Sequence, residues 1–455
     1  MSVNQKPATI TLAGGGLVGS LLSLILAKKG YQVEVFESRP DMRRVDISAG
    51  RSINLALANR GIKPLEELGL MPKINEMLIP MVGRMVHVEG EPAKLQPYGQ
   101  QKHEVIYSIP RGQLNSFLLT EAEKTGLVNI NFDTKITAVD LNTNQLMVTH
   151  RDQTKTVTFS KIIGTDGANS VLRDAVLGGN KDQQLSVDVL DHSYKELHIS
   201  PGKQGQHKIE KNALHIWPRG NFMLIALPNL DGSFTVTLFM HSKGENSFAT
   251  VNDDASINAF FDQYFANIKP DLENLVGSYT ANPTGRLATI KCAPWNYADK
   301  GLIIGDAAHA IVPFHGQGMN CGFEDCQSIA ELVPDAKHAE TANWQKIFAD
   351  IANLRKPNAD AIADMALENY IEMRDSVIQP SFLKKKAFAF KLQQLFPERF
   401  TPRYGMVMFE HRPYHEAFEL GKIHEQLLQE LSDSHASIEE LSQQTADTLL
   451  SKYGL

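Results

Sequence analysis

The order of apolar and polar residues predicts that the chain begins with a strand, a helix and a second strand. Residues 8–14 (ATITLAG) suit a strand, residues 17–30 (LVGSLLSLILAKKG) an apolar helix ended by a glycine, and residues 31–37 (YQVEVFE) another strand. This succession is typical of a βαβ unit in a parallel sheet. The apolar run is almost long enough to span a membrane, but glycines interrupt it after a short β-rich stretch. A buried helix is therefore the better prediction.

Farther along the chain the hydrophobic pattern changes twice. Pieces at 84–90 and 104–111 resemble strands of a different sheet, and the stretch from about 180 to 290 is typical of antiparallel sheet. From about residue 340 to the end the pattern is mostly helical. We predict an α/β fold: a Rossmann-like nucleotide-binding domain, an inserted antiparallel β-sheet substrate domain and a C-terminal helical region. The expected boundaries are 1–75, 100–180 and 290–340 for the first, 76–99 and 181–289 for the second, and 341–455 for the third.

Composition narrows the class of protein. With 455 residues, 42% hydrophobic and 21% charged, the chain resembles an ordinary soluble globular protein of more than one domain. A net charge of −7 argues against a nucleic-acid partner, which would need clustered basic residues. The three cysteines, Cys292, Cys321 and Cys326, are too few for a disulfide framework and lack the spacing of a zinc site. We therefore expect a reducing, cytoplasmic location and no metal.

A glycine motif lies between the first predicted strand and helix. Gly14, Gly16 and Gly19 form Gly-x-Gly-x-x-Gly, which permits a tight turn, close approach to a pyrophosphate and close packing of helix on strand. Glu37, at the end of the second strand, is placed to bind ribose hydroxyls and favours FAD or NAD over NADP. A glycine-rich turn with only a structural purpose remains the alternative.

Two aspartates follow buried strands later in the chain. Asp166 lies in KIIGTDGANSVLR (161–173), and Asp306 lies in GDAAHAIVPFHGQGMNCGFEDC (305–326), a stretch without lysine or arginine. The loop 313–320 leads into a predicted helix whose first N–H groups could face a developing negative charge. Glycines there allow the backbone to approach a flat ring. A flavin meets these requirements.

The three motifs, in this order, resemble the single-component FAD-dependent aromatic hydroxylases, in which the aspartate matching Asp306 binds the ribityl chain. Longer strings at 50–61 (GRSINLALANRG), 107–115 (YSIPRGQLN) and 368–375 (ENYIEMRD) resemble, within them, the kynurenine 3-monooxygenase family. The resemblance implies FAD as cofactor, and NADPH as a transient co-substrate that reduces it and leaves. It implies hydroxylation of L-kynurenine to 3-hydroxy-L-kynurenine by dioxygen through a flavin 4a-hydroperoxide.

The resemblance also assigns site residues. Phe314 and His315 would lie at the flavin face as catalytic residues, although a loop-orienting hydrogen bond remains an equal alternative for His315. Arg84 and Tyr98 match positions for the substrate carboxylate, and their alternatives are a surface ion pair and a loop cap. The expected substrate-binding residues are Arg84, Tyr98, Asn369, Tyr404 and Glu372, with Ile225, Leu227 and Phe239 as apolar walls. The expected cofactor-binding residues are Gly14, Gly16, Leu17, Val18, Gly19, Glu37, Arg39, Ala56, Arg111, Asp166, Asp306, Gly318, Met319 and Asn320.

Other expectations concern the tail, the assembly and the remaining polar groups. The C-terminal stretch is polar and amphipathic, so the membrane anchor of eukaryotic relatives is not expected. A homodimer is left open. His309 is expected to make a local hydrogen bond, and Met365 and Met373 to pack in the core. Two other functions remain as alternatives: hydroxylation of another aromatic acid, and a non-catalytic FAD-binding sensor.

Overall fold

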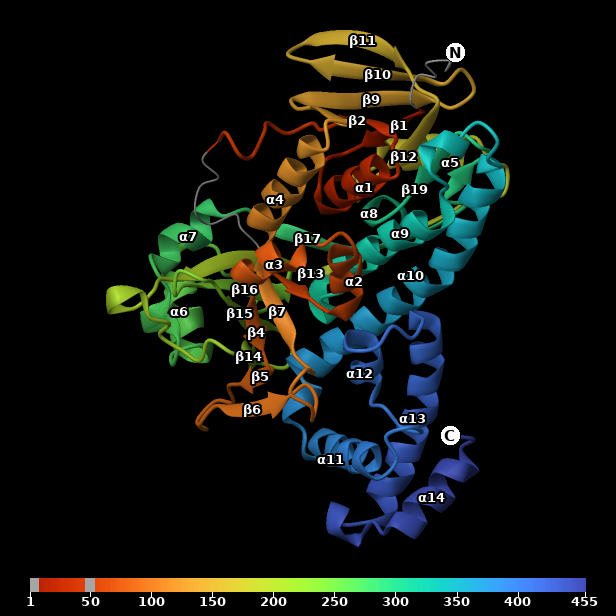
Figure 1. The fold of residues 1–455 in the computed structure, drawn as a ribbon. Helices are drawn as coiled ribbons and strands as arrows, with labels where there is room; N and C mark the ends of the chain where they lie inside the picture. Colours follow the sequence, from red (N-terminus) through yellow and green to blue (C-terminus); the bar gives the residue numbers. More distant parts are fainter. Residues whose placement is uncertain (1–7, 46–53) are drawn as a thin grey trace.

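A six-stranded sheet, in the order β18-β19-β12-β1-β2-β8, is the framework against which helix α1 (Leu17–Lys28) packs (Figure 1). The computed structural model describes residues 8–45 and 54–455, so the first four residues of the 50–61 motif lie outside it. All neighbours pair in parallel except β18 and β19. The strands are β1 (Thr9–Ala13), β2 (Gln32–Phe36), β8 (Val128–Asn131), β12 (Lys161–Gly164), β18 (Asn296–Tyr297) and β19 (Gly301–Ile303).

Helix α1 (Leu17–Lys28) is apolar on nearly every side because neighbours cover it on nearly every side. It contacts α4 (Arg111–Lys124) and α9 (Gly318–Leu332) as well as the sheet. Its two buried serines have partners: Ser20 Oγ lies 2.9 Å from Asn115 Oδ1, and Ser23 Oγ donates to the Ser20 carbonyl. The predicted βαβ unit and α/β fold class are thus confirmed, and the apolar run is a buried helix.

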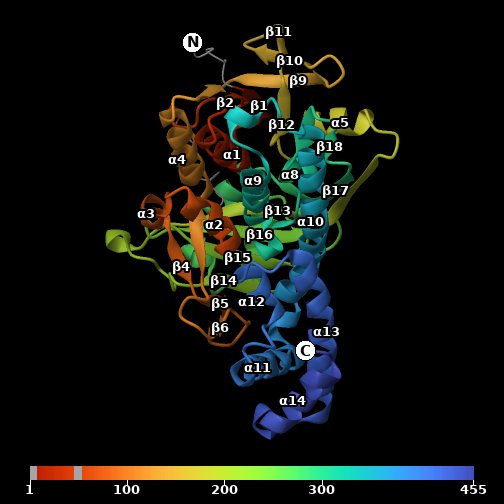
Figure 2. The same ribbon diagram turned by 45° about the vertical axis from the view of Figure 1, so that its right-hand side comes forward.

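A seven-stranded sheet, in the order β17-β13-β16-β15-β14-β5-β6, forms a second layer (Figures 1 and 2). Side chains alternate between its faces. Ile225 and Leu227 pack toward the six-stranded part, whereas Leu224 and Ala226 enter a separate core with α6 (Asp254–Tyr264) and α7 (Leu275–Ala281). The strands are β5 (Gly83–Val86), β6 (Lys94–Pro97), β13 (Gln184–Ile199), β14 (Leu214–Pro218), β15 (Met223–Pro228), β16 (Phe234–His241) and β17 (Gly285–Ala293).

The two strand-like pieces at 84–90 and 104–111 do not share a sheet. The first becomes β5, whereas the second becomes β7 (Ile106–Pro110), which lies between β3 (Asn54–Leu57) and β4 (Ile79–Met81) in a three-stranded antiparallel sheet. The pattern missed this because strand partners far apart in sequence leave no local signal. Another three-stranded sheet contains β9 (Thr134–Asp140), β10 (Gln145–His150) and β11 (Gln153–Thr158).

The C-terminal part is helical, as predicted. Helix α10 (Trp344–Arg374) runs from beside the six-stranded sheet down past the seven-stranded sheet to the other helices of the tail (Figures 1 and 2). These tail helices form their own core, which includes Phe388, Leu427 and Leu450. Among the described residues, no helix has the length and apolar character needed to cross a bilayer. The tail helices are α11 (Pro380–Leu395), α12 (Arg403–Met408), α13 (Tyr414–Ser434) and α14 (Gln443–Lys452).

Candidate active site

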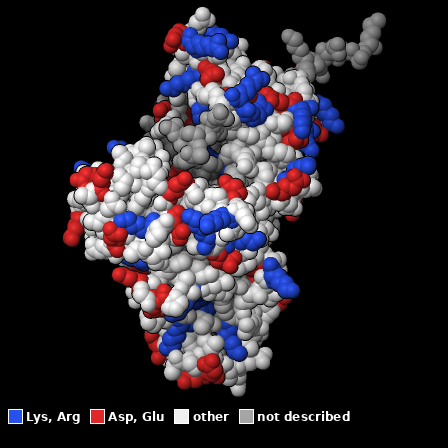
Figure 3. Space-filling view, turned by 90° about the vertical axis from the view of Figure 1, so that its left-hand side faces the viewer, with Lys and Arg blue, Asp and Glu red and all other residues white. Residues whose placement is uncertain are grey.

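A cavity of about 900 Å³ has walls from both large sheets, from α9 and from α10. This volume is at the upper end of the range for a single drug-sized ligand. Figure 3 shows a hollow in the surface, on a face where basic and acidic side chains are interspersed. Most of the residues that the sequence predicted for cofactor binding line the cavity: Gly14, Gly16, Leu17, Val18, Glu37, Arg39, Ala56, Arg111, Asp166, Asp306, Gly318 and Met319.

The three glycines of the motif meet three different steric demands. Gly14 has φ +98°, and a Cβ atom there would lie 2.6 Å from the Thr165 carbonyl oxygen. A Cβ atom on Gly19 would lie 2.1 Å from the Gly14 carbonyl oxygen, so Gly19 lets α1 pack on β1 and is itself outside the cavity wall. At Gly16 the nearest atom is Arg39 Nη2 at 3.9 Å, and the space is open to the cavity.

Replacing Gly19 with alanine is expected to lower the free energy of unfolding by about 1–3 kcal/mol, the usual cost of overpacking. The added methyl group would collide with the Gly14 carbonyl in the turn after β1 and with the Thr165 hydroxyl, and would push α1 away from the sheet. Urea denaturation of the apoprotein measures the loss. In Gly178→Ala, the matched control, the new Cβ atom meets nothing within 4 Å, so stability should not fall. An equal loss in both variants would contradict the steric explanation.

Glu37 supports the glycine turn and borders the cavity. Its Oε2 accepts a hydrogen bond from Gly15 N at 2.8 Å, and its Oε1 accepts from Arg39 N at 2.8 Å and Arg39 Nε at 2.9 Å. Burial alone would raise the pKa of Glu37, but the Arg39 guanidinium and the backbone donors outweigh burial and lower it. The carboxylate therefore stays ionised and keeps lone pairs for a ribose hydroxyl.

Asp166 and Asp306 follow β12 and β19, which are adjacent in the sheet, but their carboxylates differ in what they bind. Asp166 accepts from Ser170 Oγ at 2.5 Å and Val171 N at 2.9 Å, and so caps α5 (Val171–Gly178). Asp306 has no hydrogen-bond partner in residues 8–45 and 54–455, and its side chain is open to the cavity. Protein atoms surround the cavity, and this burial raises the pKa of Asp306. Of these two aspartates, only Asp306 has a carboxylate free for a ligand.

Helix α9 begins at Gly318, at the edge of the cavity. The first N–H groups of a helix have no partner within it, so those of Gly318 and Met319 are available to a ligand. The side chain of Asn320 lies outside the wall and binds backbone instead. Its Oδ1 accepts from Ala58 N at 2.9 Å, and its Nδ2 donates to Ala56 O at 2.8 Å. Asn320 thereby fixes β3 against the start of α9.

At the opposite end of the cavity, Arg84 is buried among polar and aromatic groups. Its Nη1 lies 2.5 Å from Glu372 Oε1, and its Nη2 donates to Asn369 Oδ1 at 3.1 Å. Its Cζ lies 5.3 Å from the ring centre of Tyr404 and 5.9 Å from that of Tyr98. The two tyrosine rings stack with centroids 4.9 Å apart. Sequence analysis left open a surface ion pair for Arg84. The structure shows an ion pair with Glu372 in which the arginine is buried and the glutamate is partly exposed.

The residues that the sequence singled out on α10 differ in how they lie relative to the cavity. Glu372 contacts Arg84 but is not among the residues that line the cavity. Met365 and Met373 both pack in the core, as expected, and Met373 also lines the cavity. Asn369 and Met373 are about one helical turn apart, so the same face of α10 borders the cavity at both positions.

The rest of this end of the cavity is apolar and aromatic. Ile225, Leu227 and Phe239 line it, as expected from their alternation on β15 and β16. Phe314 stacks on Tyr370 at 3.8 Å between centroids and meets Phe239 edge-on at 4.9 Å. Asn369 Nδ2 donates to the Phe314 carbonyl oxygen at 2.6 Å. Asn369 therefore joins Arg84 to the loop that carries Phe314.

His315 lines the same region with a neutral ring. Burial lowers the pKa of His315 to about 4. Its Nδ1 has no hydrogen-bond partner within the described residues, and its ring stacks on Tyr404 at 5.6 Å between centroids. The structure therefore shows no loop-orienting hydrogen bond from Nδ1. A neutral imidazole can donate or accept one hydrogen bond at each nitrogen.

A buried ionic network lies behind the Asp306 turn. His309 Nε2 lies 2.6 Å from Asp325 Oδ2, which also accepts from Gly305 N at 2.9 Å. Arg355 Nε binds the other oxygen, Oδ1, at 2.7 Å. His309 therefore makes the local hydrogen bond that was expected. The Cys321 sulfur is close enough to complete a metal-ligand set, but the guanidinium already pairs with the carboxylate.

This network is expected to make the free energy of unfolding depend on pH. Burial lowers the pKa of His309, but the Asp325 carboxylate outweighs burial and raises it well above its ordinary value. Below about pH 6.5 both the folded and the unfolded chain hold this proton, and the stabilisation is complete. Above that pH only the folded chain holds it, so stability falls by up to about 1.4 kcal/mol per pH unit until the folded pKa is passed. Urea unfolding of the wild type and of His309→Gln across pH 6–9 measures this, and equal slopes would contradict it.

Several wall residues were not predicted from the sequence. They include Thr134 and Lys135 at the start of β9, Leu214 on β14, and Tyr194, Glu196 and Thr237 on β13 and β16. Tyr194 and Glu196 are two apart on a strand, so alternation could have placed them on one face. Nothing local showed that this face borders the cavity.

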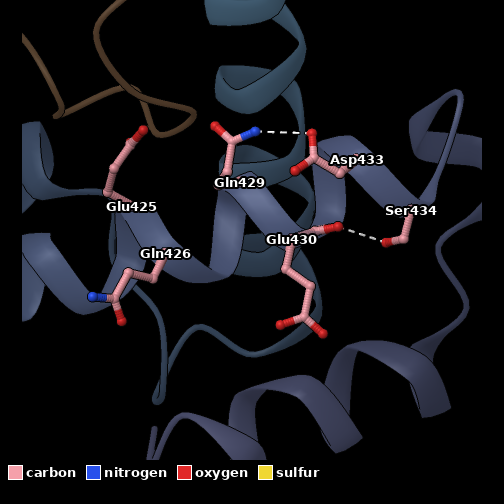
Figure 4. Close-up of a pocket in the computed structure, with 6 residues that line it drawn as sticks. All are labelled: Glu425, Gln426, Gln429, Glu430, Asp433 and Ser434. Atoms are coloured by element: carbon pink, nitrogen blue, oxygen red, sulfur yellow. Dashed lines mark hydrogen bonds between the residues drawn. The ribbon is translucent and has the colours of Figure 1, made fainter.

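A separate groove lies on α13 in the tail (Figure 4). Its side chains are polar or acidic and bind one another. Gln429 Nε2 donates to Asp433 Oδ1 at 2.8 Å, and Ser434 Oγ donates to the Glu430 carbonyl oxygen at 2.6 Å. This groove is wide open and lacks the enclosed wall that a flat cofactor needs.

Comparisons with known proteins agree with the geometry. A family model described as an FAD binding domain matches residues 8–333. The kynurenine 3-monooxygenase of Myxococcus xanthus is 45% identical over 445 residues, which cover 97% of this chain and 94% of that protein. Those of Stenotrophomonas maltophilia and Dictyostelium discoideum are 44% and 40% identical, over 95% and 99% of this chain and 94% and 98% of the relatives.

Solved structures show the same fold at low identity. The 2-methyl-3-hydroxypyridine-5-carboxylic acid oxygenase superposes with a TM-score of 0.66 at 18% identity, covering 83% of this chain and 96% of that one. The p-nitrophenol 4-monooxygenase PnpA of Pseudomonas putida gives 0.64 at 16% identity, covering 93% and 98%. Sequence relatives identify the family more narrowly than these structures do. The chain is a flavin-dependent monooxygenase and belongs to the kynurenine 3-monooxygenase family.

Proposed function

We propose that this chain hydroxylates the aromatic ring of L-kynurenine to give 3-hydroxy-L-kynurenine, using FAD, NADPH and dioxygen. The observation that carries the proposal is the buried Arg84 beside two stacked tyrosines, at one end of a cavity whose other end has a dinucleotide turn. Kynurenine has an α-carboxylate for the arginine and an aniline ring for the apolar wall. When bound, FAD takes electrons from NADPH and passes one oxygen atom of dioxygen to the ring.

The residues of the cofactor end fit FAD. Gly16 leaves room for a pyrophosphate at the start of α1, and Glu37 offers carboxylate lone pairs to the adenosine ribose. Asp306 offers an unpartnered carboxylate to the ribityl hydroxyls. The N–H groups of Gly318 and Met319 would face the flavin ring and stabilise negative charge on it. The Asp166 carboxylate caps α5, so we propose that only the backbone around it contacts the cofactor.

The residues of the substrate end explain how an amino acid could enter a site that already contains an ion pair. Arg84 is paired with Glu372, so the substrate carboxylate must replace Glu372 as its partner. A guanidinium can bind a carboxylate through two parallel hydrogen bonds. Glu372, on the outer side, would then lie near the α-ammonium group. The tyrosines Tyr98 and Tyr404 would donate to the bound carboxylate.

The apolar wall would hold the ring and exclude water. Ile225, Leu227 and Phe239 offer it no hydrogen-bonding groups, and the stacked pair of Phe314 and Tyr370 closes one side. Excluding water favours transfer of oxygen to the ring over its loss to solvent. His315 is neutral at physiological pH and could accept or donate one hydrogen bond to the substrate without bringing a charge.

Product identification after incubation with kynurenine, NADPH and air tests the proposal. We expect 3-hydroxykynurenine, and we expect kynurenine to accelerate NADPH oxidation more than anthranilate or other aromatic acids do. No acceleration by kynurenine, with acceleration by another acid in the panel, would identify a different hydroxylase. A yellow, folded protein without any NADPH oxidation would favour the FAD-binding sensor.

The assembly, the location and the division of the chain into domains are also proposals. Three buried, unpaired cysteines are consistent with a reducing cytoplasm. For the domains, we propose a nucleotide end built on the six-stranded sheet and a substrate end built on the seven-stranded sheet. A homodimer would be tested by sedimentation.

A further inference from the structure

The family string GRSINLALANRG ends in the first turn of α2 (Asn59–Glu67), and nothing proposed above uses the side chains of that turn. The backbone of the turn holds the start of α9, because Ala58 N donates to Asn320 Oδ1 at 2.9 Å. The side chains of Asn59 and Arg60 bind a different element. Both donate to backbone carbonyl groups at the end of α12 and in the loop that follows it.

Arg60 completes the hydrogen bonding of α12 at its C-terminal end. The last four carbonyl groups of a helix have no partner within it. In α12, Phe409 N donates to Gly405 O at 2.9 Å. Arg60 donates to the next two carbonyl groups, from Nη2 to Met406 O at 3.2 Å and from Nε to Val407 O at 3.0 Å. Two carbonyl groups of α12 therefore depend on one side chain of another helix.

The same two side chains hold the loop between α12 and α13. Asn59 Nδ2 donates to Phe409 O at 2.7 Å, and Arg60 Nη2 also donates to Arg412 O. The guanidinium of Arg60 is buried, and its charge is balanced by Glu324 on α9, whose Oε1 lies 2.9 Å from Nη1. A guanidinium has several N–H donors in one fixed plane, so it can hold these groups in a single arrangement. We call Asn59 and Arg60 the α12 anchor.

Helix α12 is the part of the tail that reaches the cavity. Among the described residues that follow α10, only Tyr404 and Met408 line the cavity, and both lie on α12. The Tyr404 ring stacks on Tyr98 and lies beside Arg84. In both ribbon views α12 lies below α2, at the junction with the tail (Figures 1 and 2). A shift of the end of α12 would therefore move Tyr404 relative to Arg84.

We propose that Asn59 and Arg60 are positioning residues that hold α12 so that Tyr404 meets the carboxylate of the substrate. The inference rests on the proposed function for kynurenine as the ligand. Neither anchor side chain lines the cavity, so both would act through Tyr404 and not by contact with the ligand. The hydrogen bond to Asn320 comes from the backbone of the turn, so substitutions of the anchor side chains keep it. The proposed flavin end should therefore stay in place.

Asn59→Ala in the FAD-loaded protein tests the anchor. Alanine is a better helix former than asparagine, so α2 itself should not be weakened. We expect the Kd of kynurenine, measured from the change in flavin absorbance, to rise about three- to tenfold, the scale of one lost hydrogen bond. The Kd of FAD should not change. Asn59→Asp keeps the shape and suits the start of a helix, but it cannot donate to Phe409 O, so it should bind kynurenine as weakly as Asn59→Ala.

A second anchor variant and a matched control complete the series. Arg60→Lys keeps the positive charge but not the planar set of donors, so it should weaken kynurenine binding more than Asn59→Ala does. Asn258→Ala is the control. Asn258 is also half-buried on a helix, and its Nδ2 donates to a backbone carbonyl oxygen, that of Asp254, at 2.8 Å, but α6 lies outside the cavity wall. Its loss should leave the Kd of kynurenine unchanged.

A double-mutant cycle separates positioning from a general loss of stability. In Tyr404→Phe the hydroxyl that the anchor would place is gone, so adding Asn59→Ala should raise the Kd of kynurenine by less than about twofold. The same rise in both backgrounds, or no rise in either, would overturn the proposal. A lower unfolding temperature of Asn59→Ala with the Kd of kynurenine unchanged would show a structural role alone and overturn it too. An equal rise in the Kd of FAD would also contradict it.

The two proposals fail separately. If the wild type neither binds nor hydroxylates kynurenine, the proposed function falls, and the cycle is run with the aromatic acid that accelerates NADPH oxidation. An effect of Asn59→Ala that requires Tyr404 would then still support the anchor. If kynurenine is hydroxylated and its Kd does not respond to Asn59 or Arg60, the anchor falls and the proposed function stands.

Discussion

Arg84→Ala is expected to weaken kynurenine binding by about 2–4 kcal/mol, roughly 30- to 700-fold in Kd, while FAD stays bound. The variant loses the two-pronged donor for the α-carboxylate. It also leaves Glu372, now 2.5 Å from Arg84, as an unpaired negative charge beside the place where that carboxylate should bind. Titration of the yellow protein with kynurenine, followed by the change in flavin absorbance, gives the Kd.

Two further variants separate the loss of the donor from the repulsion by Glu372. Glu372→Gln added to Arg84→Ala removes the unpaired charge and should recover part of the affinity, because contacting groups are not additive. Arg84→Lys keeps the charge but not the planar pair of donors, so it should bind kynurenine better than Arg84→Ala and worse than the wild type. Arg151→Ala, at an exposed turn between β10 and β11, is the matched control and should change nothing. If Arg84→Ala lost FAD and kept kynurenine affinity, Arg84 would belong to the cofactor end.

Asn369 connects Arg84 to the loop that carries Phe314. Its Oδ1 accepts from Arg84, and its Nδ2 donates to the carbonyl oxygen of Phe314. We therefore expect a change in the partner of Arg84 to act on the loop at the proposed flavin face. Through this one amide side chain, binding of the proposed substrate carboxylate would be coupled to the position of the aromatic wall. Hydrogen-bonded neighbours of this kind contribute as a unit.

The sequence predicted the short-range parts of the fold, because neighbouring residues determine them. The motif at Gly14, Gly16 and Gly19 follows from what a Cβ atom would collide with within a single strand–turn–helix unit. The sequence did not predict which strands pair with each other. The pieces at 84–90 and 104–111 have similar composition, yet β5 joins the seven-stranded sheet and β7 another sheet. Strand pairing depends on neighbours that come from distant segments.

Most of the residues that the sequence singled out in family strings line the cavity, whereas residues that only the sheet places in its wall were left out. Asp166 and Asp306 stand in the same sequence context after buried strands, but only the structure shows that the start of α5 takes up the first carboxylate. Glu372 and Asn369 share a face of α10, as expected, and both contact Arg84. Glu196 belongs to no motif, because only the pairing of two strands places it in the wall opposite Thr237.

Asp306→Ala is expected to give a colourless or weakly coloured protein, with FAD bound about 10- to 150-fold more weakly, the scale of a lost charged hydrogen bond. Its carboxylate opens to the cavity and has no partner among the described residues, so no other group would take its place on the ribityl hydroxyls. The ratio of flavin to protein absorbance after reconstitution measures the occupancy, and a titration with FAD gives the Kd.

Loss of flavin from Asp306→Ala must be distinguished from unfolding of the protein. The structure predicts the direction in which the stability of the apoprotein should change. The turn that carries Asp306 is held by Gly305 N donating to Asp325, and this contact does not involve the Asp306 side chain. In the apoprotein the Asp306 side chain is exposed in the open cavity and makes no hydrogen bond with residues 8–45 and 54–455, so its removal breaks no contact of the fold. Apo Asp306→Ala should therefore unfold at the same temperature as the apo wild type or at a higher one, and the two should differ only when FAD is added. Asp166→Ala should behave in the opposite way, with a less stable apoprotein, because Val171 N in the first turn of α5 and the capping hydroxyl of Ser170 both lose their acceptor. If apo Asp306→Ala were the less stable protein, its carboxylate would be supporting the fold and the loss of colour would say nothing about the ribityl chain.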